Sequence, residues 1–205
     1  MSNDIDPERP SAPTLEGPEK RVRADARRNL DGLLQAALGE FAKSGVDAPV
    51  RDIAKAAGVG VGTLYRHFPQ RSDLIKAVFR REIDACADAA AVLSAHHDPA
   101  EALSLWMHRF VDFIAAKRGL SAALLSGDPA YEALPAYFDQ VLLPALKGLL
   151  DRAVNAGAIR PGVEPLDILH AIARLAGVGD QAQAKRMVSL LADGLRHGAS
   201  GTANH

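Results

Sequence analysis

The chain has 205 residues, of which 48% are hydrophobic and 24% are charged, and its formal net charge at pH 7 is −1. These values are ordinary for a globular protein. The chain is long enough to bury the core of one large or two small domains without disulfide bonds. One cysteine excludes an intramolecular disulfide, and we see neither a bilayer-spanning apolar run nor a signal peptide, so we expect a cytoplasmic protein.

The charges are unevenly distributed. Residues 20–81 hold 13 Lys or Arg and 6 Asp or Glu, whereas the rest of the chain holds 11 Lys or Arg and 19 Asp or Glu. Such asymmetry favours a basic, nucleic-acid-facing head on an acidic body that would limit binding to DNA elsewhere. Chance clustering is the alternative.

In chain order, residues 1–20 contain four prolines, five acids and almost no periodic apolar pattern, which predicts a disordered tail. A helix is expected from about Ala24 to Ser44, because apolar residues recur at i, i+3, i+4 and i+7 and Gly45 can end it. The apolar residues of this stripe are Leu30, Leu33, Leu34, Ala37, Leu38 and Phe41.

The next segment predicts two short helices joined by a tight turn. The first runs from Val50 to Ala57 and stops at Gly58, a residue that takes the left-handed cap conformation without a Cβ clash. The second runs from Val61 to Phe68. Apolar residues at core-facing spacing would hold the pair as a helix-turn-helix. These residues are Ile53, Ala54, Ala57, Leu64 and Phe68.

The exposed side of the second helix is suited to phosphates and base edges, which indicates DNA binding. It carries Val61, Thr63, Tyr65, Arg66 and His67. Arg51 and Lys55 on the first helix are further phosphate candidates. A basic cluster before residue 29 is either a phosphate or minor-groove contact or simply a solvated segment. Its residues are Lys20, Arg21, Arg23, Arg27 and Arg28.

Helical patterns fill the rest of the chain. A linking helix is expected over 72–94. A buried helix follows Asp98, because Asp98 as the N-cap, Pro99 in the first helical position and Glu101 three residues after the cap form a capping signature. Further helices are expected over 120–126, 134–155 (with Pro144 inside it), 165–176 and 180–197, and a short one starts at Asp128. The fold class is therefore all-α, with about nine helices and no strand pattern.

Residues from about Arg27 to Val78 resemble the N-terminal motif of the TetR/AcrR family of bacterial transcriptional regulators. The matching residues are Phe41, Gly45, Ile53-Ala54, Ala57-Gly58-Val59, Gly62-Thr63-Leu64-Tyr65-Arg66-His67-Phe68, Arg71 and Leu74. The resemblance implies a helix-turn-helix domain over 21–70, an effector-binding and dimerisation domain over 71–198, and a short tail over 199–205. It implies DNA contacts at Gly62, Thr63, Tyr65, Arg66, His67 and Arg71. Arg51 and Val61 are added as expected DNA contacts from their own side chains, and at Val61 this sequence departs from many relatives, which often have a polar or basic residue there.

The resemblance also implies a homodimeric, nucleoid-associated repressor that a small apolar effector releases from palindromic double-stranded operator DNA, without a membrane partner. An activator or effector-independent regulator of the same fold is the alternative, and a helical enzyme with an incidental helix-turn-helix is a more distant one. Effector-pocket candidates are Trp106, His108, Phe110, Phe113, Tyr137 and Phe138, whose aromatic rings would otherwise simply fill the core. Dimer-interface candidates are Leu169, Ile172, Met187, Val188, Leu191 and Leu195.

No residue pattern supports catalysis, and we expect neither a cofactor nor a metal. The Gly58–Gly62 run follows a helix and lacks the spacing of a dinucleotide loop. Adjacent His96 and His97 cannot easily both reach one metal. Cys86 lies on a helical apolar stripe and is expected in the core.

Overall fold

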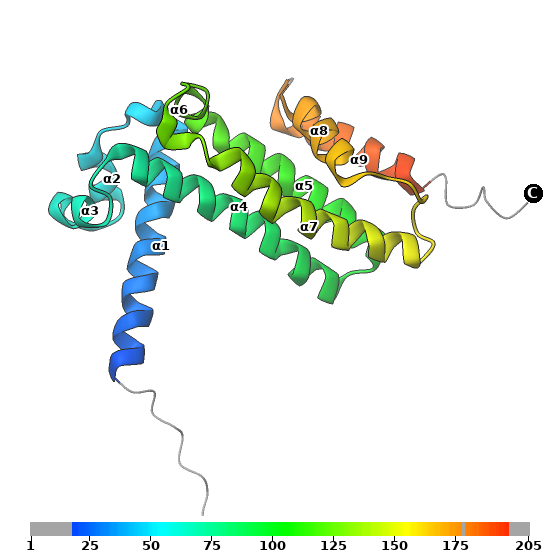
Figure 1. The fold of residues 1–205 in the computed structure, drawn as a ribbon, viewed down its shortest axis with the longest axis horizontal. Coiled ribbons are helices and arrows are strands. Elements are labelled where there is room, and N and C mark those ends of the chain that lie inside the picture. The colour runs from blue at the N-terminus through cyan, green and yellow to red at the C-terminus, as the bar shows by residue number, and fades with distance from the viewer. Residues whose placement is uncertain (1–17, 178, 197–205) are drawn as a thin grey trace, which may run out of the picture.

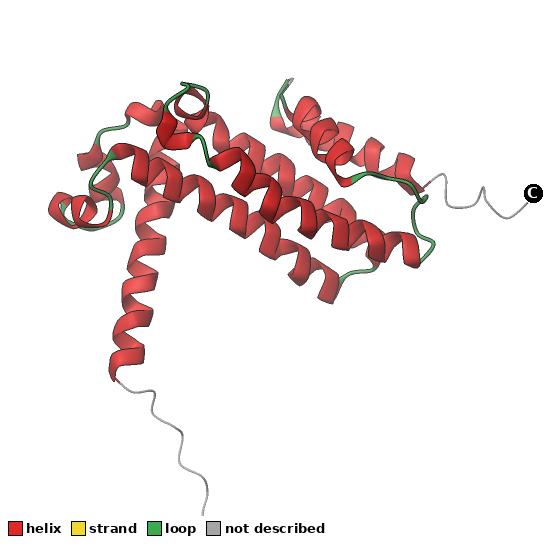
Figure 2. Cartoon of the chain, in the orientation of Figure 1, coloured by secondary structure: helices red, strands yellow, loops and turns green. Residues whose placement is uncertain are grey.

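Every element in the described part of the chain is helical, and the helices form a small head and a larger body (Figures 1 and 2). The computed structural model describes residues 18–177 and 179–196. The α-helices are α1 (Pro18–Ser44), α2 (Val50–Ala56), α3 (Val61–His67), α4 (Arg71–His96), α5 (Pro99–Lys117), α6 (Ser121–Leu124), α7 (Leu134–Asn155), α8 (Pro165–Ala176) and α9 (Gln181–Arg196). Short 3₁₀ turns are η1 (Gly45–Asp47), η2 (Arg118–Leu120) and η3 (Pro129–Tyr131).

The expected all-α class is confirmed, and most helix bounds agree with the sequence to within a residue or two. The main difference is α1, which begins at Pro18 rather than near Ala24. Residues 18–20 of the expected tail are therefore helical, while residues 1–17 and 199–205 lie outside the described residues. Within those residues, no helix is both long and apolar enough to cross a membrane.

The head is held together by the apolar stripes that the sequence indicated. Phe41 of α1, Ile53 of α2 and Leu64 of α3 are almost completely buried. Gly58 adopts a φ of 68°, the left-handed conformation that ends α2. The amide of Val59 then donates to the carbonyl of Ala54, which closes the turn before α3.

The body is built on α4, α5 and α7, which pack against one another, and α8 and α9 cover α5 on the side away from the head (Figure 1). The centre of α5 is a row of aromatic rings. Trp106 stacks on Phe110, and Phe110 stacks on Phe113, each pair with ring centroids 5.6 Å apart. The indole nitrogen of Trp106 donates to the carbonyl of Cys86 across 2.8 Å, so this buried donor is satisfied.

Cys86 lies in the core as expected and is fully buried on α4. Burial raises the pKa of its thiol to about 12, so the thiolate is disfavoured at neutral pH.

Candidate nucleic-acid interface

The outer side of α3 is the exposed polar surface of the head. Tyr65 is 50% exposed, and Gly62, Arg66 and His67 are also exposed. Leu64 points the other way, into the core, and fixes the rotation of α3. Val61 and Thr63 are partly exposed at the start of the helix. The structure thus brings the residues expected on α3 onto one accessible surface.

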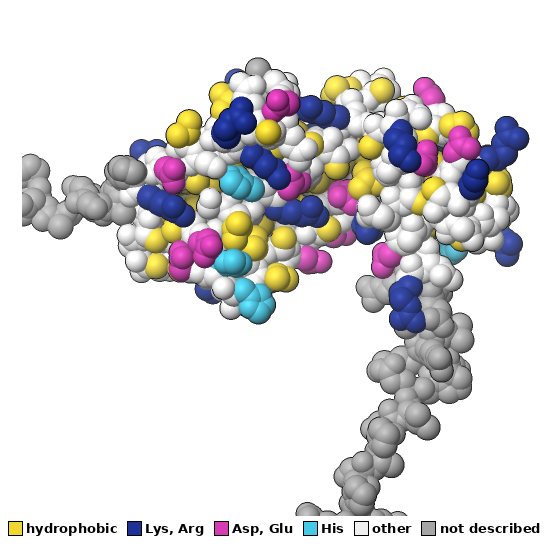
Figure 3. Space-filling view, turned by 180° about the vertical axis from the view of Figure 1, so that it is seen from behind, with side chains coloured by type: hydrophobic (Ala, Val, Ile, Leu, Met, Phe, Trp, Pro, Cys, Tyr) yellow, Lys and Arg dark blue, Asp and Glu magenta, His cyan; other side chains and the backbone are white. Residues whose placement is uncertain are grey.

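Basic side chains of the neighbouring helix extend this surface. Arg51 and Lys55 are exposed on α2, which packs against α3. Lys and Arg side chains are seen around the head at the right of Figure 3. Arg28 of the basic cluster is exposed on α1. The side chains of Lys20, Arg21, Arg23 and Arg27 lie outside the described residues, so their expected contacts stay predictions.

Arg71, expected to contact phosphate, is only partly exposed and turns toward the protein. Its Nη1 donates to the carbonyl of Val46 and, across 3.0 Å, to that of Ala48. These carbonyls immediately precede Pro49 and α2, so Arg71 at the start of α4 fixes the segment that leads into the helix-turn-helix. No pattern in the sequence indicated this contact.

Replacing Arg71 by alanine is expected to lower the free energy of unfolding by about 1–3 kcal/mol, because two carbonyls lose a charged donor. Urea denaturation measures the change. Exposed Arg51→Ala is the matched control and should leave stability within about 0.5 kcal/mol of wild type. Equal stability of all three proteins would contradict a structural role for Arg71.

The head and body meet at a close backbone contact. Gly119, in the η2 turn after α5, approaches α1 so closely that a Cβ atom there would lie 2.3 Å from the carbonyl oxygen of Phe41. The η2 turn also packs on η1. Since Phe41 is a core residue of the head, η2 is packed directly against that core.

Gly119→Ala is therefore expected to destabilise the protein by about 1–3 kcal/mol, because backbone must shift to admit the methyl group. Thermal or urea unfolding measures this. Gly148→Ala is the matched control: it lies in α7, where a Cβ atom would meet no neighbouring atom within 4 Å, and it should stabilise the helix by about 0.5–1 kcal/mol. Similar effects of the two substitutions would rule out the tight junction.

The aromatic residues expected around an effector mostly fill the core. Trp106, Phe110 and Phe113 are at most 1% exposed. Tyr137 is partly exposed, and its hydroxyl donates to Asp84 Oδ1 across 2.5 Å, which raises the pKa of the phenol. Of the expected set, Phe138 alone is among the residues that line the body cavity described below.

His108, an expected effector-pocket residue, and Asp112 join α5 to α9. His108 Nε2 lies 3.0 Å from Ser189 Oγ, and Asp112 Oδ1 lies 2.7 Å from the Lys185 ammonium. Burial, followed by the charge of Lys185, lowers the pKa of His108, which favours the neutral ring. These contacts account for both residues as links between helices.

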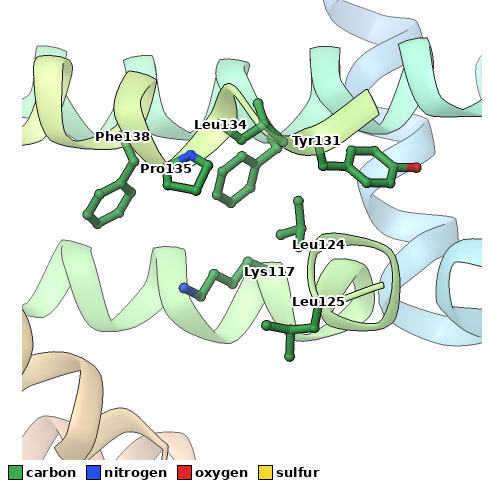
Figure 4. A pocket seen from close by; sticks show the side chains of 8 residues that line it. Lys117, Leu124, Leu125, Tyr131, Leu134, Pro135 and Phe138 are labelled. Atoms are coloured by element: carbon green, nitrogen blue, oxygen red, sulfur yellow. The ribbon is translucent and has the colours of Figure 1, made fainter. Parts of the chain in front are cut away.

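An apolar cavity of about 260 Å³ lies between the end of α5, α6 and the start of α7 (Figure 4). Its lining residues are Phe79, Lys117, Leu124, Leu125, Tyr131, Leu134, Pro135 and Phe138. One cationic side chain and one phenol are thus set among aliphatic and aromatic groups. Composition and spacing did not indicate this site, because its walls come from four separate segments.

The expected dimer residues divide into two groups. Leu169, Ile172, Val188 and Leu195 are buried within the protomer, where they attach α8 and α9 to the body. Their side chains are therefore scarcely accessible at the surface of a single protomer. Met187 is exposed and Leu191 is partly exposed. Other exposed apolar residues on these helices are Leu166 and Leu190.

Comparison with known proteins covers both the head and the body. The family profile of bacterial regulatory proteins of the tetR family matches residues 33–78, and that of the C-terminal domain of SbtR-like transcriptional regulators matches residues 98–197. A helix-turn-helix-type transcriptional regulator of Staphylococcus aureus is 41% identical over 64 residues, which cover 31% of this chain and 35% of that protein. The match therefore spans about a third of that relative.

Two crystal structures are similar over most of the chain. A TetR transcriptional regulator from Streptomyces coelicolor is 41% identical with a TM-score of 0.71, covering 81% of this chain and 97% of that one. A TetR transcription regulatory protein from Mycobacterium vanbaalenii is 36% identical with a TM-score of 0.68, covering 85% and 99%. The likeness includes both the head and the body.

Proposed function

The chain belongs to the TetR family of bacterial regulatory proteins, and from this premise we propose that it binds operator DNA as a homodimer and represses transcription until a small effector releases it. The observation that carries the proposal is the exposed polar face of α3. It combines a phenol, a guanidinium and an imidazole on a helix whose opposite side is anchored in the head core.

In this proposal α3 enters the major groove of the operator. Tyr65 and His67 would bond phosphate oxygens and set the position of the helix, while Val61 and Thr63 would read bases through methyl and hydroxyl contacts. Arg51 of α2 would add a phosphate contact. Arg71 would act by holding the start of α2, since its guanidinium already bonds the backbone there.

Dimerisation would use the exposed faces of α8 and α9. Leu166, Met187 and Leu190 are large apolar residues that solvent reaches in the protomer. Pairing these helices with their copies would bury them in a four-helix interface. Two copies of α3 would then contact successive major grooves about one helical turn apart, roughly 34–36 Å.

Release would follow from the contact between cavity and head. The segment 117–131 lines the cavity at Lys117, Leu124 and Tyr131, and within it η2 and α6 pack on the head. An effector that fits one position of this segment better than another shifts the population of head orientations. DNA affinity would fall because the two α3 helices would no longer match the groove spacing.

Selection of genomic DNA by the purified protein, followed by sequencing, tests the proposed function. Enriched promoter fragments should share a two-fold symmetric motif. A protein carrying both Tyr65→Ala and His67→Ala serves as the control and should enrich none of them. Identical enrichment by the two proteins, or no enriched motif, would overturn the proposal.

A further inference from the structure

Lys117 is placed unusually for a lysine. It extends from the last turn of α5 into the apolar cavity, with Pro135 and Phe138 of α7 on the opposite side (Figure 4). Its ammonium lies 5.9 Å from the centroid of the Phe113 ring. Within the described residues the ammonium has no hydrogen-bond or ion-pair partner. This partly exposed cation therefore has apolar groups around it and no counter-charge among the described residues.

Burial lowers the pKa of Lys117, as expected where apolar groups replace water around the charged form. An anion beside the ammonium would reverse that effect and stabilise the charged lysine. Tyr131 supplies the other polar atom of the lining, and in Figure 4 its hydroxyl points away from the ammonium. The electrostatic preference at this end of the cavity is therefore for one negative charge.

The remaining lining is suited to an apolar group. Phe79, Leu134 and Phe138 offer aromatic and aliphatic walls. Leu125 also lines the cavity although it is 86% exposed, so an occupant would cover an apolar side chain that water now contacts. Removing this apolar surface from water favours binding of an apolar group.

The volume of the cavity limits the size of the occupant. At about 260 Å³ the cavity is near the lower end of small-molecule sites, which span roughly 300–1,000 Å³. A nucleotide or a coenzyme thioester is too large to be enclosed. A dianionic phosphate would also leave a charge unpaired, because a single ammonium faces it.

We propose that this cavity binds a small monocarboxylate with an apolar tail, its carboxylate paired with Lys117 and its tail against Phe79, Leu134 and Phe138. This inference rests on the proposed function, in which the cavity receives the effector, and it specifies the effector's chemical class. The ligand is held by one charge-assisted contact at one end and by the hydrophobic effect along the rest.

Calorimetric titration of the full chain at neutral pH with octanoate, 1-octanol and octylamine tests the charge preference, since these probes share a tail and differ in the head group. Octanoate should bind at least tenfold more tightly than 1-octanol, and octylamine more weakly than either. Phenylacetate distinguishes an aromatic from an aliphatic tail. Equal affinities for octanoate and 1-octanol, or no binding of any carboxylate, would overturn the proposal.

Variants of Lys117 test whether this residue provides the preference. Lys117→Met should reduce octanoate affinity at least tenfold while leaving 1-octanol affinity unchanged or higher, and Lys117→Arg should retain the carboxylate preference. Lys147→Met on α7 is the matched control, since its lysine is exposed and paired with Asp151. Circular dichroism checks folding of each variant. A folded Lys117→Met protein that still prefers octanoate would contradict the assignment. If Lys117→Met does not fold, loss of the octanoate preference in Lys117→Arg would contradict the assignment instead.

The two levels of the proposal fail differently. Octanoate binding without release of selected operator DNA would preserve the site and contradict the release mechanism. Operator release by an uncharged or cationic compound, with no carboxylate binding, would preserve the regulatory function and overturn the assignment of ligand class.

Discussion

The protein that combines Tyr65→Ala with His67→Ala is expected to bind its selected operator more weakly by roughly 2–6 kcal/mol, or between about thirtyfold and twenty-thousandfold. Both side chains are exposed on α3, and the ring of His67 meets the core only at the edge, where its centroid lies 6.2 Å from that of Phe68. The loss should therefore come from DNA contacts while the fold is kept. Fluorescence anisotropy of labelled operator measures the affinity, and thermal unfolding measures stability.

Lys43→Ala is the matched control for that pair. Lys43 is an exposed residue of the head, on α1, where it pairs with Glu40. Its removal should change operator affinity by less than threefold. A double variant that binds like wild type, or one that loses affinity no more than Lys43→Ala, would show that α3 is not the recognition helix.

Leu190→Glu is expected to dissociate the dimer. Leu190 is 73% exposed in the protomer, so the glutamate does not disturb the core of a single chain. In the proposed interface the same position is covered by the second copy, where an unpaired carboxylate costs several kcal/mol. The dimer dissociation constant should rise at least about a hundredfold, since each 1.4 kcal/mol is tenfold. Sedimentation at micromolar concentration measures it.

Leu125→Glu provides the comparison for Leu190→Glu. Leu125 is even more exposed, but it lies just after α6 and belongs to neither α8 nor α9. That variant should sediment as a dimer like the wild type. A monomeric wild type, or a Leu190→Glu protein that remains dimeric, would contradict the proposed use of α8 and α9.

Local signals in the sequence were sufficient to predict where most of the helices begin and end. Asp98 accepts hydrogen bonds from the amides of Ala100 and Glu101, as its capping signature predicted. Gly58 and Gly157 take the left-handed conformation at the ends of α2 and α7. The bounds of α7 and α8 agree with those expected from apolar periodicity. These features depend on neighbouring residues, which one sequence contains in full.

The sequence did not indicate which apolar residues line the cavity and which pack in the hydrophobic core. Trp106 and Phe110 attracted an effector assignment because they are aromatic, yet they stack in the core. The cavity instead combines residues from α4, α5, α6 and the start of α7, so it depends on tertiary packing. Lys117 was not singled out from the sequence, because no local pattern reveals an apolar environment.

The same limit applies to the outer helices. Val188 and Leu195 of α9 were expected at the dimer interface, but they are buried against the protomer's own body. Leu190 was not among the expected residues, and it is the exposed residue on which the proposed interface depends. Arg71 is a similar case, since its carbonyl acceptors Val46 and Ala48 lie more than twenty positions earlier in the chain.

The central claim is that two copies of this chain read a symmetric DNA site through α3. Binding of the wild type to the selected operator, to one isolated half-site and to a scrambled duplex, at several salt concentrations, tests it most directly. We predict that the full site binds two chains and binds at least a hundredfold more tightly than the half-site. Affinity for every duplex should fall steeply as salt increases, because phosphate contacts release counterions. Equal affinity for the operator and the scrambled duplex would contradict the account.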